Sequence, residues 1–370
     1  MGTKTDAKTQ KENYSYSQWM LVWRRLKKHR LAMFAMVVLA FLYFIALFCE
    51  FLAPYATEKR FDESNAPPHV VRVFSEERGP QLPFIYGYTK ERNMTTLEIE
   101  YQVDKDKKFP IKFFVKGSEY RLLGLFKTDI HLFGIKGPGK IFLFGTDQLG
   151  RDIFSRVLYG TRISTTIGLI SIFFSLTLGL LIGAASALYG GFVDIVVQRA
   201  IEVLLCIPSI SLWMGLSAAL PRNWSALQVY FSITVILALR NWIGVARIVR
   251  GKFLSTKEEA FVQAAQSFGA TSWRIMVKHL IPNFMTYVIV SVTLSIPRII
   301  LAETALSFLG VGLKPPVVSW GVLLQNAQNV HSVAEYPWRL IPGLFVIVTV
   351  LAFNFLGDGL RDAADPYKAL

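Results

Sequence analysis

The chain has 370 residues, of which 52% are hydrophobic and 18% are charged. Soluble domains are about 45–50% apolar and about 25% charged, so this composition excludes an ordinary soluble protein. Lys and Arg outnumber Asp and Glu by 40 to 26, as expected for a protein with positively charged cytoplasmic loops or an anionic membrane partner. Cys49 and Cys206 both lie in apolar segments, which excludes a disulfide framework and a thiolate metal site.

Six apolar segments are long enough to cross a bilayer as helices, which takes about 20 residues each. We therefore expect an all-α membrane protein with six transmembrane helices. The first segment is too long for a cleavable signal peptide, and no small-residue cleavage site follows it. The predicted spans are Leu31–Pro54, Ile163–Tyr189, Ile201–Leu220, Leu227–Val249, Phe284–Leu309 and Trp338–Leu356.

Positive charge near the span ends predicts the orientation of the chain. Residues 1–30 are strongly basic, which places the N-terminus in the cytoplasm, and six crossings place the C-terminus there too. The loop at about residues 247–282 is also basic and falls on the same side. The N-terminal segment either acts only as this orientation signal or also lies on the bilayer as an amphipathic helix. Nucleic-acid binding is not expected, because the basic residues cluster at span ends.

Residues 55–143, between the first two spans, have a different composition. Short β-branched or alternating runs separated by turn residues predict a small β-rich extracytoplasmic insert, followed by a core of five spans at residues 144–370. The insert either stabilises the assembly or docks a soluble partner. His69 and His131 stand apart from other ligand types, so no metal site is expected there. The expected strands are His69–Phe74, Phe84–Tyr88, Thr96–Val103, Phe109–Val115 and Lys140–Phe144.

The cytoplasmic loop is predicted to begin with a short amphipathic helix. The run from Ser255 to Glu258 has the spacing of a capping box, so this helix should start near Thr256. Gly269 supplies the left-handed residue that ends such a helix. Its apolar stripe is made of Phe261, Ala264, Ala265 and Phe268.

A second short helix is expected to begin at Thr271 and to close at Pro282, where the fifth span starts. A helix–Gly–helix unit of this kind either packs against the inner ends of the bundle or inserts into a cytoplasmic partner and carries force. The residues alone leave both interpretations open.

Gln263-Ala264-Ala265, then Gly269, then His279-Leu280-Ile281-Pro282-Asn283 share the order and spacing of a known motif. This loop resembles the EAA loop of ATP-binding-cassette importer permeases, with Gln263 in place of the usual Glu. Further blocks, including residues 144–152, 303–312 and 356–366, follow the order of the oligopeptide/dipeptide/nickel class. The chain is similar to the second, C-type permease of such importers, closely over residues 144–370 and loosely over residues 15–54.

The resemblance implies a type I importer permease in the bacterial inner membrane. It implies as partners a homologous permease, two ATPase subunits and an extracytoplasmic substrate-binding protein, besides membrane lipid. The chain has no phosphate-binding G-x-x-x-x-G-K-[ST] loop, so ATP should bind to the partners and no cofactor or catalytic site is expected here. Coupling to the ATPases is expected at Gln263, Ala264, Ala265, Phe268, Gly269 and Pro282.

Charged residues inside spans are costly and often functional. Arg298 and Glu303 are five residues apart, about 140° around a helix, so they should have different surroundings. At least one of them is expected to line the pathway or its gate. Arg240 and Asn354 are further candidates for the pathway.

Other charged residues have local interpretations. Glu50 and Arg339 lie near span ends, where snorkelling to the interface is expected. Arg199 and Glu202 are three residues apart and should pair along one helix face.

Two other function classes remain, a secondary transporter and a channel, both working without an ATPase. The first should show an inverted repeat with broken midplane helices, and none is detected. The substrate stays open between oligopeptides, dipeptides, nickel chelates, oligosaccharides and opines. A pathway for peptides should be wide, wet and sparsely charged.

Overall fold

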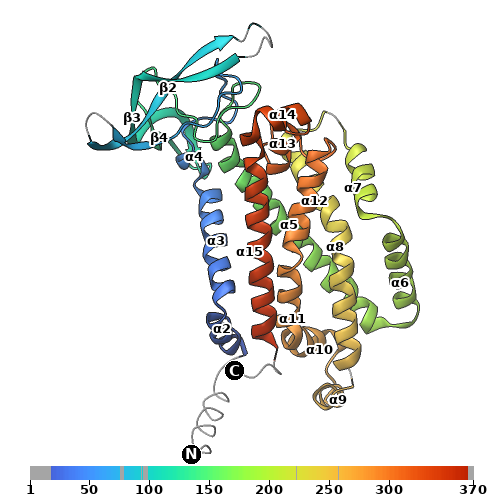
Figure 1. Ribbon diagram of the computed structural model, residues 1–370. Helices are drawn as coiled ribbons and strands as arrows, with labels where there is room; N and C mark the ends of the chain where they lie inside the picture. Colours follow the sequence, from blue (N-terminus) through green and yellow to red (C-terminus); the bar gives the residue numbers. More distant parts are fainter. Residues whose placement is uncertain are drawn as a thin grey trace, which may run out of the picture.

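The computed structural model describes residues 18–75, 79–92, 94, 99–221, 223–256 and 258–365. Within these ranges, five helices are long and apolar enough to cross a membrane, and a bent pair brings the number to six if it forms one span. The prediction of a helical multi-span protein is confirmed. Figure 1 shows a bundle of helices with a β-sheet at one end and the short helices α9 and α10 at the other.

The first helices of the chain are α2 (Gln18–Lys28), α3 (Arg30–Leu47) and α4 (Cys49–Leu52), and α5 (Ile153–Tyr189), α6 (Gly191–Cys206), α7 (Ser209–Ala218) and α8 (Ala226–Thr256) follow the sheet. The remaining elements are α9 (Ala260–Ser267), α10 (Ser272–Ile275), the π-helical turn η1 (Met276–Leu280), α11 (Ile281–Thr293), α12 (Ile296–Phe308), α13 (Trp320–Gln325), α14 (Val330–Glu335), the 3₁₀ turn η2 (Pro337–Leu340) and α15 (Ile341–Ala364).

Helices α5 and α8 form the tightest pair of the bundle. Two glycines of α5 allow the close approach: a Cβ on Gly179 would lie 2.5 Å from the Cβ of Val245, and one on Gly183 would lie 2.5 Å from the carbonyl oxygen of Ala246. Ser171 Oγ also donates to the Thr234 carbonyl at 3.0 Å. Small residues and hydroxyls of this kind hold helices together where lipid removes the hydrophobic driving force.

The predicted third span, Ile201–Leu220, is not one helix. Helices α6 and α7 are bent by 89° relative to each other at Ile207 and Pro208. Pro208 has no N–H to donate, and it forces Ile207 into an extended conformation, with φ −84° and ψ 126°. The hydropathy of residues 201–220 shows that the segment is apolar, but it carries no information about the bend.

Other predicted spans differ at their ends. The first span is shorter than Leu31–Pro54, because α3 stops at Leu47 and Phe48 separates it from α4. The second begins ten residues earlier than predicted, at Ile153, with Asp152 as its N-cap. The fifth consists of α11 and α12, which meet at residues 294–295.

The predicted β-structure between the first two spans is present as a four-stranded antiparallel sheet, while its extracytoplasmic placement stays a prediction. Its strand order is β1-β2-β3-β4, the chain order, so consecutive strands pair as hairpins. The expected strand Lys140–Phe144 is wrong: Phe142 instead makes isolated hydrogen bonds with His69. Part of the expected strand Thr96–Val103 lies outside the described residues. The strands are β1 (Arg72–Ser75), β2 (Gly79–Arg92), β3 (Ile99–Leu122) and β4 (Phe126–Ile135).

A buried polar cluster joins the sheet to the bundle at the start of α5. The carboxylate of Asp147 accepts from Arg151 Nε at 2.8 Å and from Arg156 Nη1 at 2.5 Å. Thr146 Oγ1 accepts from the Ala66 amide at 2.8 Å. Asp147 and Arg156 are almost fully buried, so each supplies the counter-charge that the other needs.

Arg339 is buried too, which corrects the snorkelling interpretation. Its guanidinium donates to Ser332 Oγ and to Asn65 Oδ1, and it lies 4.8 Å from the centre of the Tyr336 ring. The bond to Asn65 ties η2 to the segment that leads into the sheet. The described part of the insert is therefore fastened to the bundle at α5 and η2, and its strands β3 and β4 also pack against α4.

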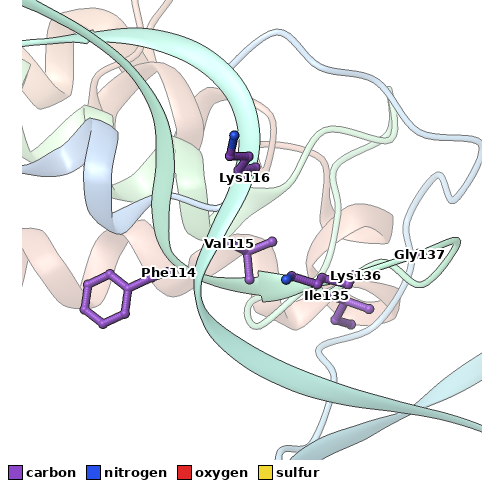
Figure 2. A pocket seen from close by; sticks show the side chains of 6 residues that line it. All are labelled: Phe114, Val115, Lys116, Ile135, Lys136 and Gly137. Carbon is purple, nitrogen blue, oxygen red and sulfur yellow. The ribbon is translucent and has the colours of Figure 1, made fainter.

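A cavity of about 500 Å³ lies on the sheet, between the middle of β3 and the end of β4. Figure 2 shows its lining: apolar side chains from both strands, with two lysine side chains at its edges. The lining residues are Phe114, Val115, Lys116, Ile135, Lys136 and Gly137.

Candidate functional site

The candidate coupling site lies at the end of the bundle opposite the sheet (Figure 1). We call residues 260–275, which comprise α9, Gly269 and α10, the coupling knob. Helix α9 begins at Ala260, later than the predicted start near Thr256. The capping-box prediction is wrong because α8 continues to Thr256, whose Oγ1 donates back to the Lys252 carbonyl at 2.8 Å.

Gly269 ends α9 as predicted, at φ +77°. Its N–H donates to the Gln266 carbonyl at 2.9 Å, and the Ala270 N–H donates to the Ala265 carbonyl at 3.0 Å. These two bonds form a Schellman motif, which turns the chain sharply and satisfies the last carbonyls of the helix. The two short helices of the coupling knob are thus joined by a defined turn.

The predicted apolar stripe of α9 divides between two environments. Phe268 is 91% exposed, and Phe261 and Ala264 are exposed as well. Ala265 instead packs, together with the 1% exposed Val262, into an apolar cluster at the ends of α5, α8 and α11. Gln263 is exposed. The coupling knob therefore has one face toward the bundle and one apolar face open to a partner.

The second helix of the coupling knob begins as predicted, since the Arg274 amide donates to Thr271 Oγ1 at 3.3 Å. It does not close at Pro282. Helix α10 passes into η1 and then into α11, of which Pro282 is the second residue. Proline has no N–H to donate, and the first turn of a helix tolerates it because the N–H groups there have no partner within the helix. Here the wider π-helical turn η1 precedes Pro282, so the chain continues as a helix. The coupling knob is thereby continuous with the fifth span.

An ion pair holds the helices beside the coupling knob. Asp194 of α6 accepts from Arg250 of α8, at 2.7 Å from Nε and 2.5 Å from Nη2. Arg250 is one of the basic residues of the loop at about residues 247–282, but the sequence does not indicate this pair, because 56 residues separate the partners. The predicted pair Arg199–Glu202 is confirmed at 2.6 Å, on an exposed face of α6.

Glu303 lies inside the bundle with no exposed surface. Its Oε1 accepts from Ser307 Oγ at 2.8 Å and from Ser319 Oγ at 2.7 Å, and its Oε2 accepts from Ser164 Oγ at 3.4 Å. The serines belong to α12, to the N-cap of α13 and to α5. Glu303 therefore does not line a pathway in this conformation, because helix packing encloses it.

Arg298, five residues earlier in α12, is exposed. The expected divergence of the two side chains is confirmed, and Arg298 is the member of the pair that stays a pathway candidate. Arg240 donates to the carbonyl of Leu204 in the last turn of α6, a group that the helix end leaves without a backbone partner. Asn354 is half-buried in α15.

Glu50 also has a partner that the sequence did not indicate. Its carboxylate pairs with Arg162 of α5, with Nη2 at 2.6 Å from Oε2. Arg162 Nε donates to the Ala46 carbonyl at 2.6 Å. The snorkelling interpretation of Glu50 is wrong, because the residue is buried against α5 and forms an ion pair between α4 and α5.

The chain matches two protein families. Residues 175–368 match the family described as binding-protein-dependent transport system inner membrane component. Residues 17–68 match the family described as the N-terminal TM domain of oligopeptide transport permease C. The first match alone covers more than half of the chain.

Several curated proteins are similar to this chain. The dipeptide transport system permease protein DppC of Bacillus subtilis (strain 168) is 32% identical over 93% of this chain and 84% of its own length. DppC of Lactococcus lactis subsp. cremoris (strain MG1363) is 33% identical over 93% and 89%. The oligopeptide transport system permease protein OppC of Bacillus subtilis is 39% identical over 62% and 73%.

Among solved structures, an inward-facing form of the MetNI methionine ABC transporter aligns with a TM-score of 0.45 at 17% identity, covering 57% of this chain and 97% of that one. The family matches and the relatives that span nearly the whole sequence agree with one another. The chain therefore belongs to the family of inner-membrane components of binding-protein-dependent transport systems, the permeases of ATP-driven importers.

Proposed function

We propose that this chain is the C-type permease subunit of a peptide importer, and that with a homologous permease it forms the translocation pathway. The observation that carries the proposal is the coupling knob, a rigid helix–turn–helix with an exposed apolar face. The peptide substrate is supported by the named substrates of the relatives, oligopeptides and dipeptides.

The packing of the coupling knob supports a mechanical role. Val262 belongs to the same apolar cluster as Val249 and Phe253 of α8 and Met276 of η1, and this cluster also contains residues of α5 and α11. Close-packed protein interiors transmit displacement instead of absorbing it. When a partner moves the exposed face of the coupling knob, the ends of three spans move with it. Alternating access then follows from rigid-body motion of the spans.

We assign the partner proteins to the two ends of the bundle. Two ATPase subunits bind on the side of the coupling knob, which makes this the cytoplasmic side, with the N- and C-termini. The substrate-binding protein docks on the side of the sheet. ATP is bound and hydrolysed by the ATPases, while this chain holds no cofactor or metal, catalyses no reaction and binds no nucleic acid.

Phe268 gives the direct test. Replacing Phe268 with Ala removes an exposed anchor without touching the core, so the chain should fold. We expect the affinity for the ATPases to fall by about tenfold, which corresponds to about 1.4 kcal/mol, and substrate uptake to fall with it. The measurements are ATPase copurification and binding-protein-stimulated uptake in proteoliposomes.

Phe74→Ala is the matched control, because Phe74 is also an exposed phenylalanine but lies in β1, at the other end of the molecule. It should leave ATPase binding unchanged. Parental ATPase affinity and uptake in the Phe268→Ala variant would refute the coupling role of the knob.

A further inference from the structure

The hairpin between β3 and β4 has an unusual turn. Three residues, 123–125, connect the paired residues Leu122 and Phe126. Two of the three have positive φ, +53° at Leu123 and +74° at Gly124, and the Leu125 N–H donates to the Leu122 carbonyl at 3.0 Å. Hairpin positions with positive φ favour Gly, Asn or Asp. A leucine at positive φ is disfavoured, so an apolar side chain is kept here at a conformational cost.

The tip of this hairpin exposes its apolar side chains. Leu125 is 75% exposed, Phe126 67% and Leu123 45%. Hairpin turns that face water carry polar residues, whereas contiguous exposed apolar residues mark a surface that contacts a partner or a membrane. We call residues 122–126 the apolar tip.

Positive charge lies directly behind the apolar tip. Arg121 and Lys127 occupy opposite positions in the pairing of β3 with β4. Like charges at such positions destabilise a hairpin, and a negatively charged surface would relieve the repulsion. Lys136 adds positive charge farther along the same hairpin, beside the cavity in Figure 2, whereas Lys116 lies 3.9 Å from the carboxylate of Asp129.

The hairpin runs along the end of the helical bundle. In its middle, His131 Nδ1 lies 2.5 Å from the Ala53 carbonyl, just after α4. On the facing strand, the ring of Phe114 lies 6.3 Å from the ring of Phe51 in α4. The hairpin is thus held against α4, the short helix that directly follows α3. The hairpin that carries the apolar tip therefore lies at the end of the first span, next to the bilayer.

We propose that the apolar tip inserts into the headgroup layer of the membrane and that Arg121 and Lys127 bind the phosphates of anionic phospholipids. A lipid surface fits better than a protein partner for two reasons. It matches both the apolar tip and the cationic pair behind it. It is also continuous with the exposed apolar side of α3, where Phe41, Phe44 and Leu47 are exposed.

The depth of the tip can be measured in the full chain, assembled with its partners in proteoliposomes. A nitrobenzoxadiazole label is placed at Leu125→Cys in a Cys206→Ser background, since Cys49 is fully buried. The matched control is Leu82→Cys in β2, because Leu82 is 74% exposed and Leu125 is 75% exposed. Quenching by spin-labelled lipid is compared with quenching by iodide supplied on both sides.

We expect spin-labelled lipid to quench the label at position 125 and iodide to lose access to it, while the label at position 82 stays open to iodide. Equal access of iodide to both labels would overturn the proposal. Protection of position 125 from both quenchers would also overturn it, because the tip would then be covered by protein.

The role of the charges is tested by the double variant Arg121→Gln, Lys127→Gln. For the parental protein, lipid quenching at position 125 should be stronger in vesicles containing phosphatidylglycerol than in pure phosphatidylcholine. The double variant should lose this difference, while Lys105→Gln with Lys107→Gln, which removes two exposed charges from another part of β3, should keep it. An unchanged difference in the double variant would refute headgroup binding.

Discussion

The two ends of the helical bundle are fastened by different kinds of interaction. At the sheet end, Asp147 and Arg156 form a buried ion pair, and the buried Arg339 donates to Asn65, which is 274 residues away in the sequence. At the other end, the coupling knob rests on a small apolar cluster and exposes Phe268. Buried, directional bonds fix one geometry, whereas an exposed apolar face gains from contact with another molecule. The sheet end is built as a fixed part of the bundle, and the coupling knob as a surface to be engaged.

The largest effect should follow from breaking the polar cluster at the sheet end. In Asp147→Asn the buried guanidinium of Arg156 loses its counter-charge, which costs about 3–5 kcal/mol when one partner of a buried pair is removed. We expect a lower yield of folded protein and earlier thermal aggregation in detergent, measured by fluorescence-detected size-exclusion chromatography after heating.

Asp104→Asn is the control, since Asp104 pairs with Lys107 near the surface of the sheet. Exposed pairs of this kind contribute little to stability, so this variant should behave like the parent. If both variants aggregate at the same temperature as the parent, the sheet end is not held by the buried cluster.

His69 should make the sheet end sensitive to pH. Its Nδ1 accepts from the Phe142 amide at 3.0 Å, and burial lowers its pKa from 6.5 to about 4. The neutral ring is thus the folded form, and the stability it contributes is complete above pH 6.5. As the pH falls from 6.5 toward 4, the unfolded segment binds the proton first, and up to about 3 kcal/mol is lost.

Hydrogen exchange of residues 139–144, corrected for intrinsic rates, should show this loss of protection between pH 7.5 and 4.5. His69→Asn keeps an acceptor but does not titrate, so its protection should change less over the same range. An identical pH dependence in the parent and the variant would assign the effect to other groups.

The smallest effect on stability, but a specific one on coupling, is expected at the knob. A Cβ added to Gly269 or to Gly251 would meet open space, and the two positions differ in that Gly269 has φ +77°. Gly269→Ala should cost about 1 kcal/mol locally and reorient α10, whereas Gly251→Ala in α8 should be neutral or stabilising. Binding-protein-stimulated ATPase activity should fall in the first variant and stay normal in the second. Normal stimulation of ATPase activity in both variants would show that coupling does not depend on the geometry of the turn at Gly269.

Much of the fold could be predicted because the bilayer and the backbone impose local rules. Span length follows from membrane thickness, and the turn at Gly269 follows from the need for positive φ. The bend at Pro208 escaped prediction because a break shorter than three residues hardly changes the hydropathy of a window. The start of α9 was misplaced because Thr256 satisfies its hydroxyl within α8 instead of capping a new helix.

The parts of the candidate site that are made of consecutive residues could be predicted from the sequence. The contacts between residues far apart in the sequence could not. The residues of the coupling knob are consecutive, so their periodicity is visible in the sequence. The partner of Glu50 is Arg162, 112 residues away, and the serine partners of Glu303 come from three segments. The periodicity of a sequence does not reveal such long-range contacts. Glu303, a charged residue inside a span, was therefore predicted to be a pathway candidate, although it is part of the helix packing.

The surroundings of Glu303 have a consequence for how the protein is made. Each of its three serine hydroxyls also accepts a backbone N–H, from Trp320, Leu313 and Val322. A hydroxyl that accepts in this way points its own proton at the carboxylate, so the carboxylate is solvated only after α5, α12 and α13 have come together. During synthesis α5 enters the membrane first, and α12 arrives carrying a polar group that lipid does not accommodate. The carboxylate therefore gains part of its solvation when α12 docks on α5, which is already in place, and the rest when α13, which follows α12 in the chain, packs against both.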